Sequence, residues 1–376
     1  MSASTALGYP VISADSHVTE PADLWTSYID EELRARAPRV EAREDGDVFV
    51  CDGVDLFPVG IVHAVRYRDG VVQPNGRYDD IPASGYDPVA RLADIEPDGV
   101  SHEVLYPTIA MRLFSIEEPA FADACSRAYN TWISDFCKNA PDHFKATGII
   151  SLEDIRNAVA EMERCKGLGL SGVMVAVAPD GAEPYEHELY QDFWRVAQEL
   201  DMPVSMHAAT QRKASGSHFA IPAAEAFLHY TSVQKTLIGM IYGGLFDRFP
   251  DLKVISVEND AGWAANIIER MDYISVKGRF KQMHTNQLNQ EAPSVYWHKN
   301  IWYTMMRDRA AVLSREIIGT DRIMWSSDFP HGDSSWPESI KVIDDVMAGI
   351  PAHDQWMMLH GNAANLYGFP RTELPR

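Results

Sequence analysis

The chain has 376 residues, an apolar fraction of 46% and a formal net charge of -21, which describe a globular protein long enough to bury a large core. The surplus of carboxylates argues against nucleic-acid or anionic-membrane partners, because both bind clustered Lys and Arg. Four scattered cysteines form no CxxC pair, and the most apolar run, LIGMIYGGLF, is far too short to span a bilayer. We therefore expect a cytoplasmic protein without disulfides, acting on a small-molecule substrate.

The first predicted strand is VISADSHV, residues 11–18, and it ends in two polar side chains of the metal-ligand type. Positions i and i+2 of a strand point to the same side, so Asp15 and His17 are expected to project together. This pair suggests a metal site. Taken by itself, the stretch also fits an aspartate at a strand-ending turn beside a partly buried histidine.

The next part of the chain, about residues 22–85, reads as a small insertion after the first strand. ADLWTSYIDEELRARAP has the pattern of a short amphipathic helix. DVFVCDGVDLFPV reads as two strands joined by a turn at Asp52-Gly53.

Beyond this insertion, short β-branched runs alternate with longer segments of helical period, which is typical of βαβ units around a parallel sheet. Eight alternations favour a single (β/α)8 TIM-like barrel domain over residues 1–376, with a doubly wound open sheet as the alternative. The predicted strands are VISADSH, EVLYPT, KATGIIS, SGVMVAV, PVSMH, KVISVE, NIWYT and RIMWSSD.

In a barrel of this kind, the chemistry belongs at the carboxyl ends of the strands. The first strand ends in Asp15 and His17, the fifth in His207, the sixth in Glu258 and the eighth in Asp328. Singly, His207 fits a hydrogen-bonded core histidine and Asp328 fits a turn residue. Together, imidazoles and carboxylates from four strand ends predict a site for a divalent ion, with zinc, manganese and iron all compatible.

Several stretches, in order along the chain, resemble the amidohydrolase-2 group of the amidohydrolase superfamily: VISADSHVTEP, PVSMHA, FPDLKVISVENDAGW, IMWSSDFPH and HGNAANLYGF. That group includes aminocarboxymuconate semialdehyde decarboxylase and hydroxybenzoate decarboxylases. The resemblance implies a distorted barrel, a homodimer, and a divalent ion, zinc first, with manganese or iron as alternatives. It implies that the ligands are Asp15, His17, His207 and Asp328.

Two departures from the family pattern concern function. Decarboxylases of this group resemble one another in a histidine at the end of strand six, where this chain has Glu258 followed by Asn259. No lysine closes the fourth strand, so the carbamate-bridged dinuclear centre of some superfamily members is not expected. Glu258 could still reach a second ion, which leaves one or two ions per chain open.

The leading functional hypothesis is a metal-dependent hydrolase acting on an ester, thioester, amide, lactone or a C–C bond beside a carbonyl. Asp328 would hold the ion and take a proton from its water, while Glu258 would orient that water or act as a second acid-base group. The alternative is a nonoxidative decarboxylase of an aromatic or dienoic acid. A third hypothesis is a binding protein with a relict metal site.

Further residues near the predicted strand ends are candidates for supporting roles. Arg112 could clamp a substrate carboxylate, and His331 could donate to a developing oxyanion. Glu20 reads as an acid opening the next helix, where the helix dipole favours it. His102 precedes its strand and is expected at the opposite, stability end of the barrel.

Overall fold

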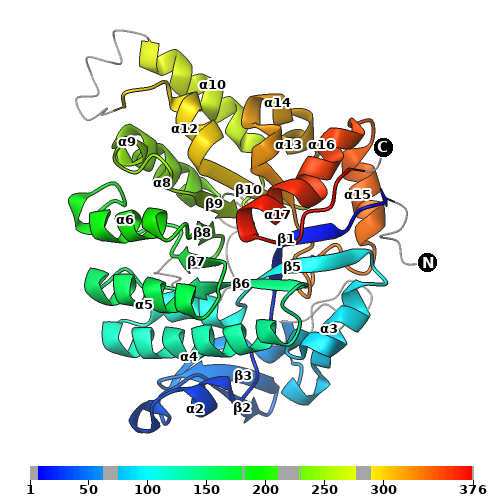
Figure 1. The fold of residues 1–376 in the computed structure, drawn as a ribbon. Helices are drawn as coiled ribbons and strands as arrows, with labels where there is room; N and C mark the ends of the chain where they lie inside the picture. The colour runs from blue at the N-terminus through cyan, green and yellow to red at the C-terminus, as the bar shows by residue number, and fades with distance from the viewer. Residues whose placement is uncertain are drawn as a thin grey trace.

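The structure is a computed structural model that describes residues 7–61, 75–179, 183–210, 228, 230–276 and 289–374. Eight parallel strands form a nearly closed barrel with helices around it (Figure 1). Their order in the sheet follows their order in the chain, whereas a doubly wound sheet reverses direction, so the barrel prediction is confirmed. The barrel strands are β1 (Val11–His17), β5 (Val100–Tyr106), β6 (Phe144–Ile149), β7 (Gly172–Val175), β8 (Val204–His207), β9 (Val254–Val257), β10 (Ile301–Met305) and β11 (Ile323–Trp325).

Strands β7, β8 and β9, in the middle of the sheet order, are buried along their whole length. Helices cover their outer face and side chains fill the barrel, which is why they read as continuous apolar runs in the sequence. The covering helices are α3 (Pro88–Ile95), α4 (Pro119–Lys138), α5 (Ile155–Gly167), α6 (Gln191–Glu199), α8 (Thr231–Tyr242), α9 (Leu245–Arg248), α10 (Gly262–Val276), α12 (Pro293–Asn300), α13 (Arg309–Leu313), α14 (Arg315–Ile318) and α15 (Ser339–Met347). Among the described residues, no helix combines the length and apolarity that crossing a bilayer requires.

Between β1 and β5 the chain forms α2 (Leu24–Tyr28) and an antiparallel sheet of β2 (Arg39–Arg43), β3 (Gly46–Cys51) and β4 (Val54–Pro58), drawn at the bottom of Figure 1. The hairpin between β3 and β4 turns at Asp52 and Gly53, both with positive φ, as the sequence predicts. Residues 62–74 of the expected insertion lie outside the described residues.

The prediction of one helix over ADLWTSYIDEELRARAP was wrong. The helix ends at Tyr28, a short 3-10 turn follows at Glu31–Leu33, and strand β2 begins at Arg39. Ile29 already has an extended backbone (φ -91°, ψ 158°), so the helix ends well before Pro38. The run RVEAR alternates charged and apolar residues, which is the pattern of a half-buried strand, so the sequence did carry a signal for β2.

The C-terminal segment closes the end of the barrel where the strands begin. It consists of α16 (Ala352–Trp356), a short π-helix at Met357–Gly361 and α17 (Asn362–Tyr367). Helix α17 packs beside β1 (Figure 1). The amide of Asn362 donates to the carbonyl oxygens of Thr320 (2.8 Å) and Ile323 (2.7 Å). These bonds explain part of the HGNAANLYGF motif, which anchors the chain end to the start of β11.

Candidate metal centre

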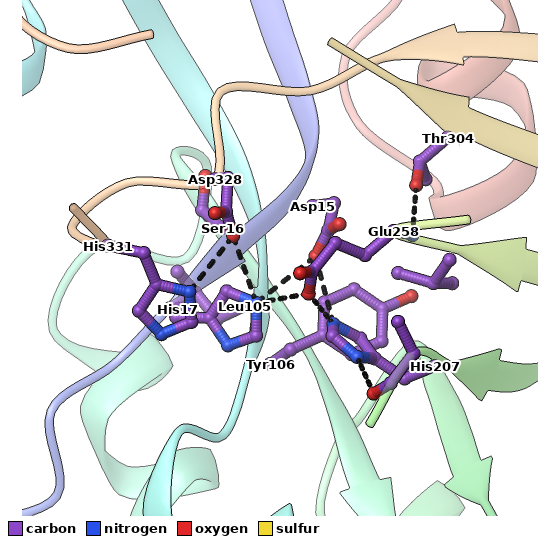
Figure 2. Close-up of polar contacts among 12 residues, drawn as sticks. Asp15, Ser16, His17, Leu105, Tyr106, His207, Glu258, Thr304, Asp328 and His331 are labelled. Atoms are coloured by element: carbon purple, nitrogen blue, oxygen red, sulfur yellow. Dashed lines mark hydrogen bonds and ion pairs between the residues drawn. The ribbon is translucent and has the colours of Figure 1, made fainter. Parts of the chain in front are cut away.

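Four strand ends bring imidazole and carboxylate groups together at the mouth of the barrel (Figure 2). Nε2 of His207 lies 3.5 Å from Asp15 Oδ1 and 3.4 Å from Glu258 Oε2. Nε2 of His17 lies 3.6 Å from the same Asp15 oxygen and 3.3 Å from Asp328 Oδ1. The structure therefore brings together all five residues that the strand ends predicted.

The two imidazoles are oriented by their far nitrogens. Nδ1 of His17 contacts the carbonyl oxygen of Pro107 at 2.7 Å, and Nδ1 of His207 contacts that of Ala208 at 2.8 Å. A carbonyl oxygen can only accept, so each Nδ1 carries the proton. In the neutral ring, the Nε2 lone pair then faces the cluster, which is the arrangement seen where histidines bind metals.

The centre contains buried polar atoms whose needs the protein does not meet. Both carboxylate oxygens of Asp15 and the Nε2 atoms of His17 and His207 are buried without a hydrogen-bond partner. Leaving such atoms unsatisfied costs roughly 1–3 kcal/mol each. A divalent cation would satisfy all of them at once, so the donor set fits the metal that the sequence predicts.

Unusual backbone conformations set the directions of two carboxylate side chains at this end of the barrel. Glu258 and Asp328 have φ values of 55° and 58°, in the left-handed region that non-glycine residues rarely adopt. The amide of Glu258 donates to the hydroxyl of Thr304 (2.9 Å), which holds its conformation in place. Each such residue costs roughly 1–2 kcal/mol, and strain of this kind gathers where a site demands a particular geometry.

The carboxyl groups of Glu258 and Asp328 differ in their affinity for protons. Burial raises the pKa of Glu258 above its ordinary value, and the charge of Asp328 acts in the same direction. Burial also opposes ionisation of Asp328, but His331 and His17 outweigh it and hold its pKa below the ordinary range. Because 38% of the Glu258 side chain is exposed, its carboxyl group can also exchange protons with solvent. The pKa values of the two carboxyl groups are thus shifted in opposite directions, upward for Glu258 and downward for Asp328.

His331 extends the cluster on the other side of His17. Its ring stacks on His17 with centroids 4.0 Å apart, and its Nδ1 lies 3.1 Å from Asp328 Oδ1. The hydroxyl of Thr108 donates to the carbonyl of Val18 (2.7 Å), so it can only accept from Nε2 of His331 (3.0 Å). Burial lowers the pKa of His331, but the Asp328 charge outweighs it and raises the pKa to about 9.

Arg112 lies at the mouth of the barrel, on the 3-10 segment η7 (Ile109–Ser115) that follows β5. One guanidinium nitrogen lies 3.5 Å from the carbonyl oxygen of Ala209, two residues beyond His207. The guanidinium also stacks over the ring of Phe57, a residue of β4, at 5.2 Å. Its Nε is buried without an acceptor, which leaves a donor for a ligand.

Glu20 has a role that sequence reasoning missed. Helix α2 begins at Leu24, so Glu20 does not lie in its first turn as expected. Its buried carboxyl group accepts from the backbone amides of Thr108 (3.1 Å), Ile109 (3.0 Å) and Ala110 (2.8 Å). Burial raises the pKa of Glu20 to about 7 against these bonds. Glu20 thus holds the start of the segment that carries Arg112, and no local pattern distinguishes it from an ordinary helix-opening acid.

The fold and the centre can now be compared with known proteins. A family model described as amidohydrolase matches residues 15–369. The chain belongs to this amidohydrolase family. It is 23% identical over 320 residues to the gamma-resorcylate decarboxylase of Rhodococcus jostii (strain RHA1), covering 77% of this chain and 93% of that protein. The gamma-resorcylate decarboxylase of Rhizobium sp. (strain MTP-10005) is 26% identical over 219 residues, which span 54% of this chain but only 65% of that protein.

Solved structures share the fold. An amidohydrolase from Mycobacterium avium subsp. paratuberculosis K-10 superimposes with a TM-score of 0.77 at 23% identity, covering 97% of this chain and 99% of the other. A dihydroxybenzoic acid decarboxylase from Polaromonas sp. JS666, with bound manganese and 2-nitroresorcinol, gives a TM-score of 0.66 at 20% identity, covering 96% and 98%. At these identities the likeness establishes the barrel fold.

Proposed function

We propose that the protein is a metal-dependent, nonoxidative decarboxylase of an aromatic hydroxycarboxylic acid. The observation that carries the proposal is the position of Glu258 at the end of β9: its carboxyl group lies 3.4 Å from a candidate ligand nitrogen, and burial raises its pKa, which favours the protonated form. The sequence favoured a hydrolase because Glu258 stands where family decarboxylases have a histidine. A protonated carboxyl group can replace that histidine as a proton donor, which removes the objection.

The ion would be held by Asp15, His17, His207 and Asp328. A divalent ion bound there would supply Lewis-acid polarisation of the substrate carboxylate and its neighbouring hydroxyl. Imidazole and carboxylate ligands suit zinc and manganese alike. Zinc is the ion expected from the sequence, and the manganese in the Polaromonas relative makes manganese the second ion to test.

We propose one ion per chain rather than two. The candidate ligands form two groups: Asp15, His17, His207 and Glu258 in one, and His17, Asp328 and His331 in the other. Both groups depend on His17, whose Nδ1 is engaged with a backbone carbonyl. Its single free nitrogen can bind only one ion, so the two groups describe one centre.

In the reaction, the bond between the ring carbon and the carboxylate breaks and CO2 leaves. Glu258 delivers its proton to that ring carbon and becomes a carboxylate, so the product carries one new C–H bond. The exposed part of its side chain then allows Glu258 to regain a proton from solvent. Direct coordination of Glu258 to the ion would remove its proton, so the acid role and the ligand role exclude each other.

Arg112 and His331 are proposed to contact the substrate. The unpaired Nε–H of Arg112 is suited to a planar oxyanion such as a second carboxylate or a phenolate. His331 donates Nε2–H to Thr108 and Nδ1–H to Asp328, so it would act on the substrate through its positive charge, which favours an oxygen that gains negative charge during the reaction.

Hydrolysis remains the second candidate because Glu258 departs from the residue that family decarboxylases carry. In that case Glu258 would be ionised and would take the proton from an attacking water. Protein loaded with manganese or zinc should be incubated with 2,6-dihydroxybenzoate and related hydroxybenzoates in D2O, with aryl esters and lactones in parallel. We expect CO2 release and one deuterium on the vacated ring carbon. Hydrolysis of the esters without CO2 release would replace the proposal with the second candidate.

The experiment also tests the third hypothesis, a binding protein with a relict site. A protein purified without chelators that contains no metal, and whose melting temperature is unchanged by added zinc or manganese, would be such a protein. For the enzyme, we expect both bound metal and a higher melting temperature. Glu258→Gln should strongly reduce CO2 release while the ion stays bound, whereas Asp260→Asn, in the same loop and exposed, should retain both.

A further inference from the structure

Strands β1 and β11 form the two edges of the eight-stranded sheet, and the candidate ligands lie on both sides of the seam between them. At their carboxyl ends, the amide of His17 donates to the carbonyl of Phe329 (2.6 Å). The amide of Asp328 donates to the carbonyl of Asp15 (3.0 Å). The ion site therefore depends on how these two chain segments are held together.

Arg91, on α3, lies beneath this seam and is fully buried. Its Nε and Nη2 donate to the two carboxylate oxygens of Glu103, also fully buried, on β5. Its remaining donors reach the carbonyl oxygens of His17 (2.8 Å), Ser84 (3.4 Å) and Phe329 (3.2 Å). The five N–H groups of the guanidinium thus have five acceptors.

Two of those acceptors are backbone carbonyl oxygens of the segments that carry proposed metal ligands. His17 is a proposed ligand on β1, and Phe329 directly follows Asp328, the proposed ligand after β11. One rigid, planar group therefore binds both sides of the seam at once, while Glu103 fixes its orientation. The Phe329 ring, with the guanidinium carbon 4.9 Å from its centroid, covers the same group.

We propose that Arg91 is a positioning residue for the metal centre: its guanidinium sets the separation between the ligands on β1 and the ligand after β11. This inference rests on the proposed metal-dependent function. A lysine could not substitute, because a single ammonium nitrogen cannot reach Glu103 and two carbonyl oxygens on different chain segments.

Removing Arg91 by itself would leave the Glu103 carboxylate buried without its partner and could unfold the protein. The decisive variant is therefore the double change Arg91→Met with Glu103→Leu, which removes both charges and retains volume. Replacing a buried ion pair by packed apolar side chains commonly preserves folding. The matched control is Arg315→Met with Asp354→Leu, which removes the ion pair between α14 and α16 (2.7 Å).

The experiment compares wild type and both double variants, each stripped of metal and titrated with Co2+, Zn2+ and Mn2+. Arg91→Met/Glu103→Leu should retain the wild-type far-UV spectrum but bind the ions about 10- to 100-fold more weakly. Its Co2+ absorption bands should also shift, because they report the geometry of the ligands. The control should match wild type in affinity and bands.

Arg91→Lys provides an independent check. It retains the positive charge opposite Glu103 but loses the planar guanidinium with its five N–H donors. We expect it to fold and to show the same weakened affinity and altered Co2+ bands as the double variant. Wild-type affinity and wild-type bands in either Arg91 variant would overturn the positioning role. A wild-type protein that binds none of the three ions would instead overturn the proposed function itself, so the two failures are distinguishable.

Discussion

The two ends of the barrel each carry a group of three histidines, and only one group is suited to bind an ion. At the base, Nδ1 of His360 contacts the carbonyl of Pro10 (3.0 Å) and its Nε2 accepts from the amide of Thr372 (3.0 Å). His102 stacks on His143 with centroids 5.3 Å apart; it lies within β5 rather than before it, but at the end of the barrel that the sequence predicts. These rings serve as packing and as hydrogen-bonding groups between chain segments.

At the mouth, His17 and His207 each retain an Nε2 that faces carboxylates from other strands. Both candidate ligand groups in the described part of the chain lie there. The contrast teaches that clustering of imidazoles is a weak indicator of metal binding. The stronger indicators are a far nitrogen engaged with a carbonyl and a near nitrogen buried without a partner, as in His17 and His207.

The largest expected effect is the loss of the ion when a ligand at the mouth is removed. His207→Ala and Asp328→Ala should each weaken metal affinity by more than about 100-fold, because a direct ligand matters more than the supporting groups around it. His102→Gln, at the base, should leave affinity unchanged. Elemental analysis after dialysis and the far-UV spectrum measure the two properties. Full occupancy in either mouth variant would refute the ligand set.

The next largest effect is expected at Glu258. Glu258→Gln retains the shape of the side chain but removes its acidic proton, so turnover should fall by roughly 10²–10⁴-fold. Metal content should stay at the wild-type value if one ion is bound. Loss of half of a two-equivalent content would show a dinuclear centre and contradict our proposal of one ion per chain.

Added metal should stabilise the protein by binding to the residues at the mouth of the barrel and not to the histidines at its base. At an ion concentration 100-fold above Kd, the free energy of unfolding should rise by about 2.7 kcal/mol, because the ion binds the folded state. His102→Gln should show the same increment, and His207→Ala should show almost none. Chemical denaturation with and without the ion measures this difference, and equal increments in the two variants would contradict it.

The smallest predicted effect concerns the base in the metal-free protein. Burial lowers the pKa of His102 to about 4, and neighbouring His143 and His360 act in the same direction. The unfolded chain binds this proton more readily, so stability is full above about pH 6.5 and falls as the pH is lowered toward 4. His102→Gln should remove that part of the pH dependence in urea unfolding curves. Parallel curves for the two proteins would refute it.

The barrel and the five converging residues could be predicted because they depend on patterns along the chain. Alternating strand and helix periods give the barrel, and topology brings the strand ends to one face. Asp15, His17, His207, Glu258 and Asp328 follow from that rule without knowledge of distances. Strand β2 was missed, although RVEAR alternates charged and apolar residues as a strand does.

The supporting groups could not be predicted, because their contacts join segments that are distant in sequence. Glu20 binds amides about 90 positions away, and Arg91 reaches a carbonyl 238 positions away. Each resembles an ordinary helix charge until the fold is known. The opposite proton affinities of Glu258 and Asp328 likewise arise from burial and neighbours that only three-dimensional packing sets.

The contact between His17 and Pro107 links the proposed metal binding to the proposed substrate recognition. Pro107 immediately precedes the loop that bears Arg112, so the main-chain oxygen that orients a ligand ring belongs to the segment proposed to recognise the substrate. We therefore expect a mutation that moves this loop to change the orientation of the His17 imidazole as well. A change of substrate specificity in this loop would therefore require compensating changes that restore the orientation of the His17 ring.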